Sequence, residues 1–138
     1  MGWQMHITQE TDYAVRIVHC LAKSGTRRDA RSISEEVNVT LRFSLKILGK
    51  LSSAGIVHSY KGNKGGYELA RPPAEISLKD VLCAVEGPYI LSRCVGAGHD
   101  GCNCGTMGEC AFQKAFERIS EDVNRQLAAV TFQSVMEG

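Results

Sequence analysis

The chain has 138 residues, of which 43% are hydrophobic and 22% are charged, and its formal net charge is +1. This length fits one domain, or a small domain with an appendage, and the apolar content argues against a disordered chain. No apolar run approaches the roughly 20 residues of a membrane-spanning helix, and the start lacks a secretory signal, so we expect a cytoplasmic protein.

Basic residues are unevenly distributed along the chain. Residues 1–82 contain 12 Lys and Arg against 8 Asp and Glu, whereas residues 83–138 contain 4 against 7, so the two parts carry +4 and −3. A basic front half suits a polyanion such as DNA, although on charge alone a solvated surface explains it equally well.

The first amphipathic helix is predicted over residues 12–22, with a polar stripe formed by Asp12, Arg16 and His19. The polar loop GTRRDAR follows, and we count its Arg28 among the predicted DNA contacts.

A second, short helix is predicted by Ser32 and Glu35, which have the spacing of a capping box, and it is expected to run through Val37. Asn38 can adopt the left-handed turn conformation, and Thr40 is a suitable N-cap for the helix that follows.

The third predicted helix, LRFSLKILGKLSSA, has two distinct faces and a C-terminal stop at Gly55. A basic stripe at i, i+4 and i+8 consists of Arg42, Lys46 and Lys50. A short helix, a tight turn and a second helix with a basic stripe are typical of a helix-turn-helix, whose second helix enters the major groove. The expected apolar face consists of Leu41, Leu45, Ile47, Leu48 and Leu51.

A basic β-hairpin comes next. Residues 56–60 and 67–70 predict two short strands joined by the glycine-rich turn KGNKGG. A helix-turn-helix followed by such a hairpin indicates a winged helix, in which Lys61, Asn63 and Lys64 can reach phosphates or the minor groove.

The C-terminal part contains a helix in ISLKDVLCAVEG, a cysteine-rich stretch and a long amphipathic helix. We expect the long helix to pair with its copy in a homodimer, the alternative being that it packs back on its own domain. Its apolar positions are Phe112, Phe116, Ile119, Val123, Leu127 and Val130.

The predicted fold class is therefore mostly α with a small β-hairpin wing. We expect a winged helix-turn-helix DNA-binding domain at residues 5–86, a cysteine-rich loop at 87–110 and a dimerisation helix at 111–135.

Several stretches together resemble the Rrf-type winged helix-turn-helix transcriptional regulators, of the IscR, NsrR and RirA type. They are ITQETDYAVRIVHCLA, ISEEVNVTLRFSLKILGKLSSAGIV, GNKGGYELARP, ISLKDVLCAVEG and the cysteine loop. The resemblance implies a dimeric regulator, often a repressor, that binds a double-stranded DNA operator. It assigns DNA reading to Thr40, Arg42, Phe43 and Lys46, and a wing contact to Lys61.

The cysteine loop, CVGAGHDGCNCGTMGEC, holds four of the six cysteines. Thiolates are the usual ligands of iron-sulfur clusters and of structural zinc. The nearest pair, Cys102 and Cys104, makes a poor zinc knuckle because zinc usually takes pairs spaced C-x2-C. A disulfide between Cys94 and Cys110 is a further possibility on oxidation.

The family resemblance implies a 4Fe-4S or 2Fe-2S cluster held by three cysteines, the last two separated by five residues. Cys104 and Cys110 fit that interval, with Cys94 as the first ligand. Cys102 is then either an alternative ligand or a fourth one.

A non-cysteine ligand completes the cluster in some members of the family. One branch has a histidine three residues after the last cysteine, where this chain has Gln113. Another branch uses an aspartate in the first helix of the other subunit, which matches Asp12. The alternative for Asp12 is an ion pair with Arg16 four residues later.

The predicted function is a transcription regulator whose DNA affinity follows a cluster that senses redox state, nitric oxide, oxygen or iron. A cluster-free thiol switch or a zinc-dependent regulator of the same fold is the main alternative, and a small iron-sulfur electron carrier is a distant one. The sequence offers no Ser/His/Asp or paired-carboxylate arrangement for hydrolysis, so we do not expect an enzyme.

Overall fold

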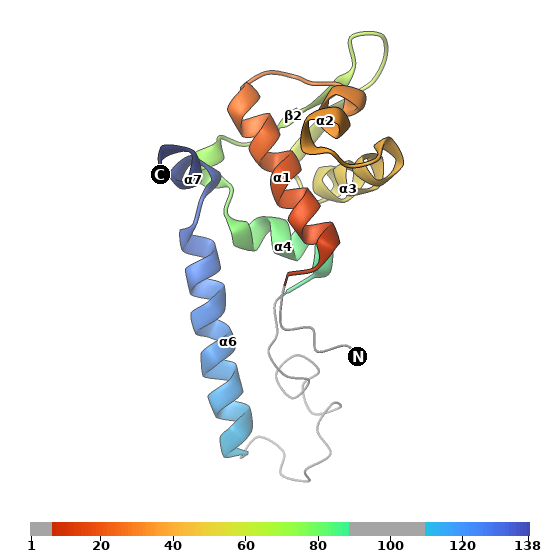
Figure 1. Cartoon of the computed structure of the whole chain (residues 1–138). Helices are drawn as coiled ribbons and strands as arrows, with labels where there is room; N and C mark the ends of the chain where they lie inside the picture. Colours follow the sequence, from red (N-terminus) through yellow and green to blue (C-terminus); the bar gives the residue numbers. More distant parts are fainter. Residues whose placement is uncertain (1–6, 89–109) are drawn as a thin grey trace.

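The computed structural model describes residues 7–88 and 110–138. A winged domain lies at one end of the molecule, and a long helix extends away from it as an arm (Figure 1). The elements in chain order are α1 (Gln9–Ser24), α2 (Ala30–Val37), α3 (Leu41–Ser53), β1 (Val57–Tyr60), β2 (Gly66–Leu69), the 3-10 helix η1 (Pro73–Glu75), α4 (Leu78–Glu86), α6 (Ala111–Ala129) and α7 (Phe132–Glu137).

One hydrophobic core joins the helices of the winged domain. Helices α1, α2 and α3 pack on one another, and α4 packs on α1 and α3. The expected periodicity of the first helix is confirmed, because Ile17, Cys20 and Leu21 are buried while Asp12 and Arg16 are exposed. Burial of apolar side chains such as these is the dominant favourable term in folding. Other fully buried members of the core are Ile33, Ile47, Leu48, Leu51, Ile56, Ile76 and Val81.

Helix α2 begins one turn earlier than predicted. The side chain of Asp29 is its N-cap and accepts a hydrogen bond from the Ser32 N–H at 2.7 Å. The predicted capping box at Ser32 is therefore wrong, because Ser32 already lies inside the helix. The prediction failed because Asp29 and Ser32 are both good N-cap residues. The C-terminus is as predicted, with Asn38 in the left-handed conformation at φ 58°.

Helix α3 has the predicted caps. Thr40 Oγ1 accepts a hydrogen bond from the Phe43 N–H, and Gly55 (φ 77°) closes the other end. The N–H groups of Gly55 and Ile56 donate back to the carbonyls of Ser52 and Leu51, which is a Schellman motif.

The buried face of α3 differs from the predicted one at one position. Leu45 is 44% exposed, whereas Ser44 is fully buried. The residues that face the core recur at i, i+3, i+4 and i+7 from Ser44, and Leu45 falls one step off this stripe. Leu45 therefore lies on the same outer side as the neighbouring Lys46.

The wing is a two-stranded antiparallel hairpin, as predicted. Val57 pairs with Leu69, and Tyr60 pairs with Gly66 at the outer end. The loop before α2 lies along the second strand, because Arg28 and Tyr67 exchange two backbone hydrogen bonds of 2.9 and 2.7 Å. A Cβ at Gly66 would lie 2.7 Å from the Arg28 carbonyl oxygen, so this close approach requires glycine.

The C-terminus returns to the winged domain. The long predicted helix ends at Ala129, and the separate helix α7 packs on α1 and η1. Phe132 is only 1% exposed, and its N–H donates to the Ile76 carbonyl at 3.0 Å. Residues 111–135 therefore belong to two helices rather than one, because the chain changes direction at Val130. The second of them, α7, adds Phe132 to the core of the winged domain.

Helix α6 is buried only in part. The helix packs on α4, and Ser120 at its middle is buried. Its N-terminal half presents Phe112, Phe116 and Ile119, which are 74%, 37% and 46% exposed. Packing back on the chain's own domain therefore applies to part of the helix, and pairing with a second copy stays a prediction. Across residues 7–88 and 110–138, no helix combines the length and apolarity needed to span a membrane.

Candidate nucleic-acid interface

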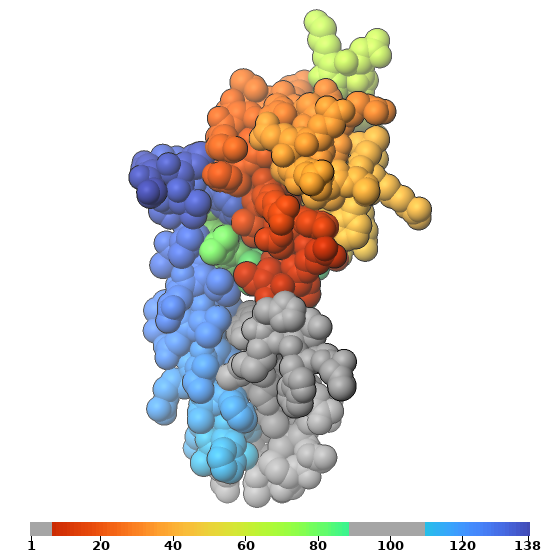
Figure 2. Space-filling model, viewed as in Figure 1, coloured from red at the N-terminus to blue at the C-terminus, as the bar shows by residue number. Residues whose placement is uncertain are grey.

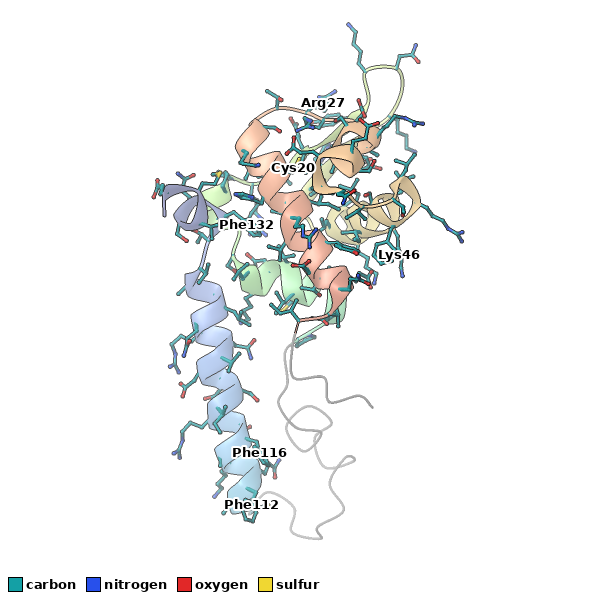
Figure 3. All side chains as sticks on the ribbon, in the orientation of Figure 1. Cys20, Arg27, Lys46, Phe112, Phe116 and Phe132 are labelled. Carbon is teal, nitrogen blue, oxygen red and sulfur yellow. The ribbon has the colours of Figure 1, made fainter. Side chains whose placement is uncertain are left out.

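The basic stripe of α3 is present at the surface of the winged domain. Arg42 is exposed, and the side chains of Lys46 and Lys50 are 59% and 36% exposed. Lys46 points outward from the helix (Figure 3). Cationic side chains at this spacing on the second helix of a helix-turn-helix can reach both phosphates and base edges in the major groove.

Phe43 links this stripe to α1. Its ring meets the Tyr13 ring edge to face, with centroids 5.6 Å apart. Lys46 Nζ lies 5.6 Å from the Phe43 ring centroid, and Arg16 Cζ lies 5.3 Å from that of Tyr13. A continuous row of ring and cation contacts thus runs from the first helix to the outer face of α3.

Two lysines of the stripe also meet a carboxylate. Glu10, in the first turn of α1, places Oε1 2.7 Å from Lys50 Nζ and 3.9 Å from Lys46 Nζ. The sequence did not suggest this contact, because the residues are 36 to 40 positions apart.

The wing tip projects beyond the rest of the domain (Figure 2). Lys61, Asn63 and Lys64 are all exposed there, so the predicted wing residues are available to a partner. Gly62 has φ 95°, and a Cβ at Gly65 would lie 2.6 Å from the Tyr60 carbonyl oxygen. The tight turn that brings two lysines to the tip therefore requires glycine at both places.

Arg27 stabilises the base of this wing, and the sequence analysis missed it. Its guanidinium carbon lies 3.4 Å from the centroid of the Tyr60 ring, and its Nη1 donates to the Lys64 carbonyl at 3.0 Å. Arg27 is labelled at the base of the wing in Figure 3. Tyr60 in turn donates its hydroxyl to Glu68, and this hydrogen bond raises the pKa of Tyr60. In the sequence, only the pair of arginines in the GTRRDAR loop pointed to this contact, and the pair does not indicate which arginine faces the wing.

Arg28, the other arginine of the pair, turns inward. Its side chain is 22% exposed, and Nη1 lies 3.2 Å from Glu36 Oε1 and 2.7 Å from Ser24 Oγ. Nε donates to Ser32 Oγ at 3.1 Å. The guanidinium thereby joins α1 to α2, and a DNA contact by Arg28 stays a prediction.

Cys20 lies beside this network. Arg28 Nη1 is 3.5 Å from Cys20 Sγ. Burial raises the pKa of the Cys20 thiol to about 11, and its hydrogen bond to Glu36 adds to this rise. The hydrogen bond with Cys20 lowers the pKa of the Glu36 carboxyl, and the hydrogen bond from Arg28 lowers it further. Cys20 is therefore a protonated structural thiol at neutral pH.

The predicted metal ligands fall into two groups. Cys94, Cys102 and Cys104 lie outside the described residues. Asp12 and Cys110 are described: Asp12 Oδ2 accepts a hydrogen bond from Arg16 Nη2 at 2.6 Å, and Cys110 is the N-cap residue of α6. In the described ranges alone, no three His, Cys, Asp or Glu side chains come close enough to hold a metal ion.

The profile of one protein family covers the whole described fold. Residues 7–138 match Rrf2, a family described as iron-dependent transcriptional regulators. The chain belongs to the Rrf2 family. This Rrf2 protein is accordingly a DNA-binding transcription regulator and not an enzyme.

Curated relatives agree with this assignment. The chain is 30% identical over 135 residues to an HTH-type transcriptional regulator of Neisseria meningitidis serogroup A, covering 96% of this chain and 88% of the relative. It is 34% identical over 122 residues to protein aau3 of Rhizobium meliloti, covering 85% and 78%.

Solved structures confirm the predicted fold. The oxidised form of Staphylococcus aureus CymR matches with a TM-score of 0.70 at 28% identity, covering 97% of this Rrf2 chain and 98% of that one. IscR of T. potens matches with a TM-score of 0.74 at 20% identity, covering 97% and 88%. CymR of B. subtilis, described as the global cysteine regulator of that organism, matches with a TM-score of 0.73 at 23% identity, covering 96% of each chain.

Proposed function

We propose that this Rrf2 protein is a dimeric regulator, acting as a repressor, whose operator affinity is set by an iron-sulfur cluster. The observation that carries the proposal is the row of contacts from Asp12 through Arg16 and Tyr13 to Phe43. It connects a candidate cluster ligand to a side chain on the DNA-reading helix.

The candidate ligands are Cys94, Cys104 and Cys110, with Cys102 as an alternative or fourth thiolate and the partner's Asp12 as an oxygen ligand. When bound, the cluster supplies an iron centre that nitric oxide, oxygen or iron shortage can modify or remove. Ligation through Asp12 would compete with its 2.6 Å ion pair to Arg16. Release of Arg16 from Asp12 would change the contact of Arg16 with the Tyr13 ring, and through Tyr13 the contact with Phe43.

A homodimer is part of the proposal. The exposed apolar strip of Phe112, Phe116 and Ile119 on α6 is the surface that a second copy would cover. Exposed aromatic and aliphatic side chains in one strip favour association over solvation. Two copies would present two α3 helices and two wings to a two-fold operator.

A cluster-free thiol switch is the second candidate. It is favoured by the 28% identity to S. aureus CymR, a structure of an oxidised form, and by the cysteine-rich sequence between α4 and α6. Oxidation of loop thiols would then take the place of cluster loss.

Anaerobic purification tests the proposal. Native mass spectrometry of the dimer is expected to show the mass of a 2Fe-2S or 4Fe-4S cluster. Addition of nitric oxide is then expected to change the visible absorbance of the protein and its affinity for DNA together. The DNA is a duplex selected from a random pool. Cys104→Ala is expected to lose the cluster, whereas Cys83→Ala, on α4, should keep it. A colourless protein without iron would instead support the thiol switch.

A further inference from the structure

The contact between Glu10 and two lysines of α3 is not explained by the core or by the proposed cluster. Glu10 Oε1 is 2.7 Å from Lys50 Nζ and 3.9 Å from Lys46 Nζ, and the Glu10 side chain is only 22% exposed. Partial burial removes water from the pair, so the attraction is screened less than that of a fully exposed ion pair.

The two lysines border an open surface rather than the interior. Lys46, Gly49, Lys50 and Ser53 of α3, with Cys83 of α4, line a shallow depression of about 660 Å³. A phosphate group can approach their ammonium groups from this side. Arg42, on the same stripe one turn earlier, is exposed and takes part in none of the ion pairs of the described residues.

We propose that Glu10 is an internal competitor for DNA on the recognition helix. A carboxylate and a DNA phosphate are both acceptors for the same ammonium donors, and DNA gains affinity by replacing counterions at such groups. In free protein Glu10 occupies Lys50 and partly neutralises Lys46. Phosphate binding at these lysines therefore has to displace Glu10.

This competition lowers affinity for any DNA sequence, because phosphate contacts carry no sequence information. In helix-turn-helix proteins the N-terminal residues of the second helix contact base edges. Arg42 lies at this end of α3 and does not pair with Glu10. Glu10 thus limits non-specific binding and leaves Arg42 available for base reading. The proposal goes beyond cluster sensing and does not require a cluster.

Glu10→Gln in the full chain tests the competition. We expect about three- to tenfold tighter binding to a mixed-sequence fluorescent duplex at about 50 mM salt, measured by anisotropy. The slope of log affinity against log salt should steepen by up to about 0.9, the value of one added phosphate contact. Glu35→Gln, which removes the same charge from an exposed site on α2, is the matched control and should change the slope little.

A second pair of variants separates the contact from net charge. In a Lys50→Met background, Glu10→Gln should give a clearly smaller gain, because its main partner is gone. Glu10→Asp keeps the charge but withdraws the carboxylate, and it should also tighten binding. This variant carries the test if Glu10→Gln does not fold. Unchanged or weaker binding by a folded Glu10 variant overturns the proposal, as does a full gain that persists in the Lys50→Met background.

Discussion

The guanidinium carbon of Arg27 lies 3.4 Å from the centroid of the Tyr60 ring, and this stack joins the loop before α2 to the last residue of β1. The same guanidinium donates to the Lys64 carbonyl in the wing turn. Two elements separated by more than 30 residues thereby hold the wing in one orientation.

Arg27→Ala is expected to loosen the wing without unfolding the domain, because the core does not include Arg27. A cation-π contact of this kind contributes about 0.5–2 kcal/mol. Amide hydrogen exchange at residues 61–65 should accelerate, and DNA affinity should fall. Arg27→Lys keeps the charge but loses the flat stack, so its exchange should also accelerate. Arg31→Ala, which removes an exposed arginine from α2, should leave exchange in the wing unchanged.

Phe132→Ala is expected to destabilise the winged domain by about 3–5 kcal/mol, since it empties a fully enclosed aromatic site. Urea unfolding followed by circular dichroism measures the change. Val135→Ala, in the same short helix but 49% exposed, should cost less than about 1 kcal/mol. Equal losses for the two variants would contradict the closing role of Phe132.

Phe112→Ser combined with Phe116→Ser is expected to shift the protein from dimer to monomer. Both side chains are exposed in the single chain, so their loss should not lower the stability of the winged domain itself. Sedimentation velocity over a concentration series reads out the mass. Glu117→Ala, an exposed change directly after Phe116, is the control. A double variant that stays dimeric would place the interface elsewhere.

The buried thiol of Cys20 predicts a pH dependence of stability. Its folded pKa, about 11, exceeds the ordinary value of 9.0, so between these values the folded state binds more protons than the unfolded state. This contribution to the free energy of unfolding is complete below pH 9 and is lost as the pH rises through 11. Urea midpoints of the native protein should fall more steeply over this interval than those of Cys20→Ala. Parallel curves would show that the thiol does not contribute.

Local sequence patterns were sufficient for most elements. The caps at Thr40 and Gly55 and the turn KGNKGG each act within a few residues, so α3 and the wing could be predicted from neighbouring side chains. The cap of α2 was misplaced because Asp29 and Ser32 both suit that role. The residue directly before Asp29 pairs with Tyr67, which lies far away in the sequence, so a local pattern could not place this boundary.

What the sequence determined by itself was the kind of protein, since helix periodicity, the basic stripe and the glycine-rich wing are properties of short segments. Only the tertiary structure decided which arginine holds the wing, that Phe132 closes the core, and that Glu10 meets Lys50. These contacts join residues far apart in the chain, and their partners are set by how whole helices pack. A local pattern carries no information about that packing.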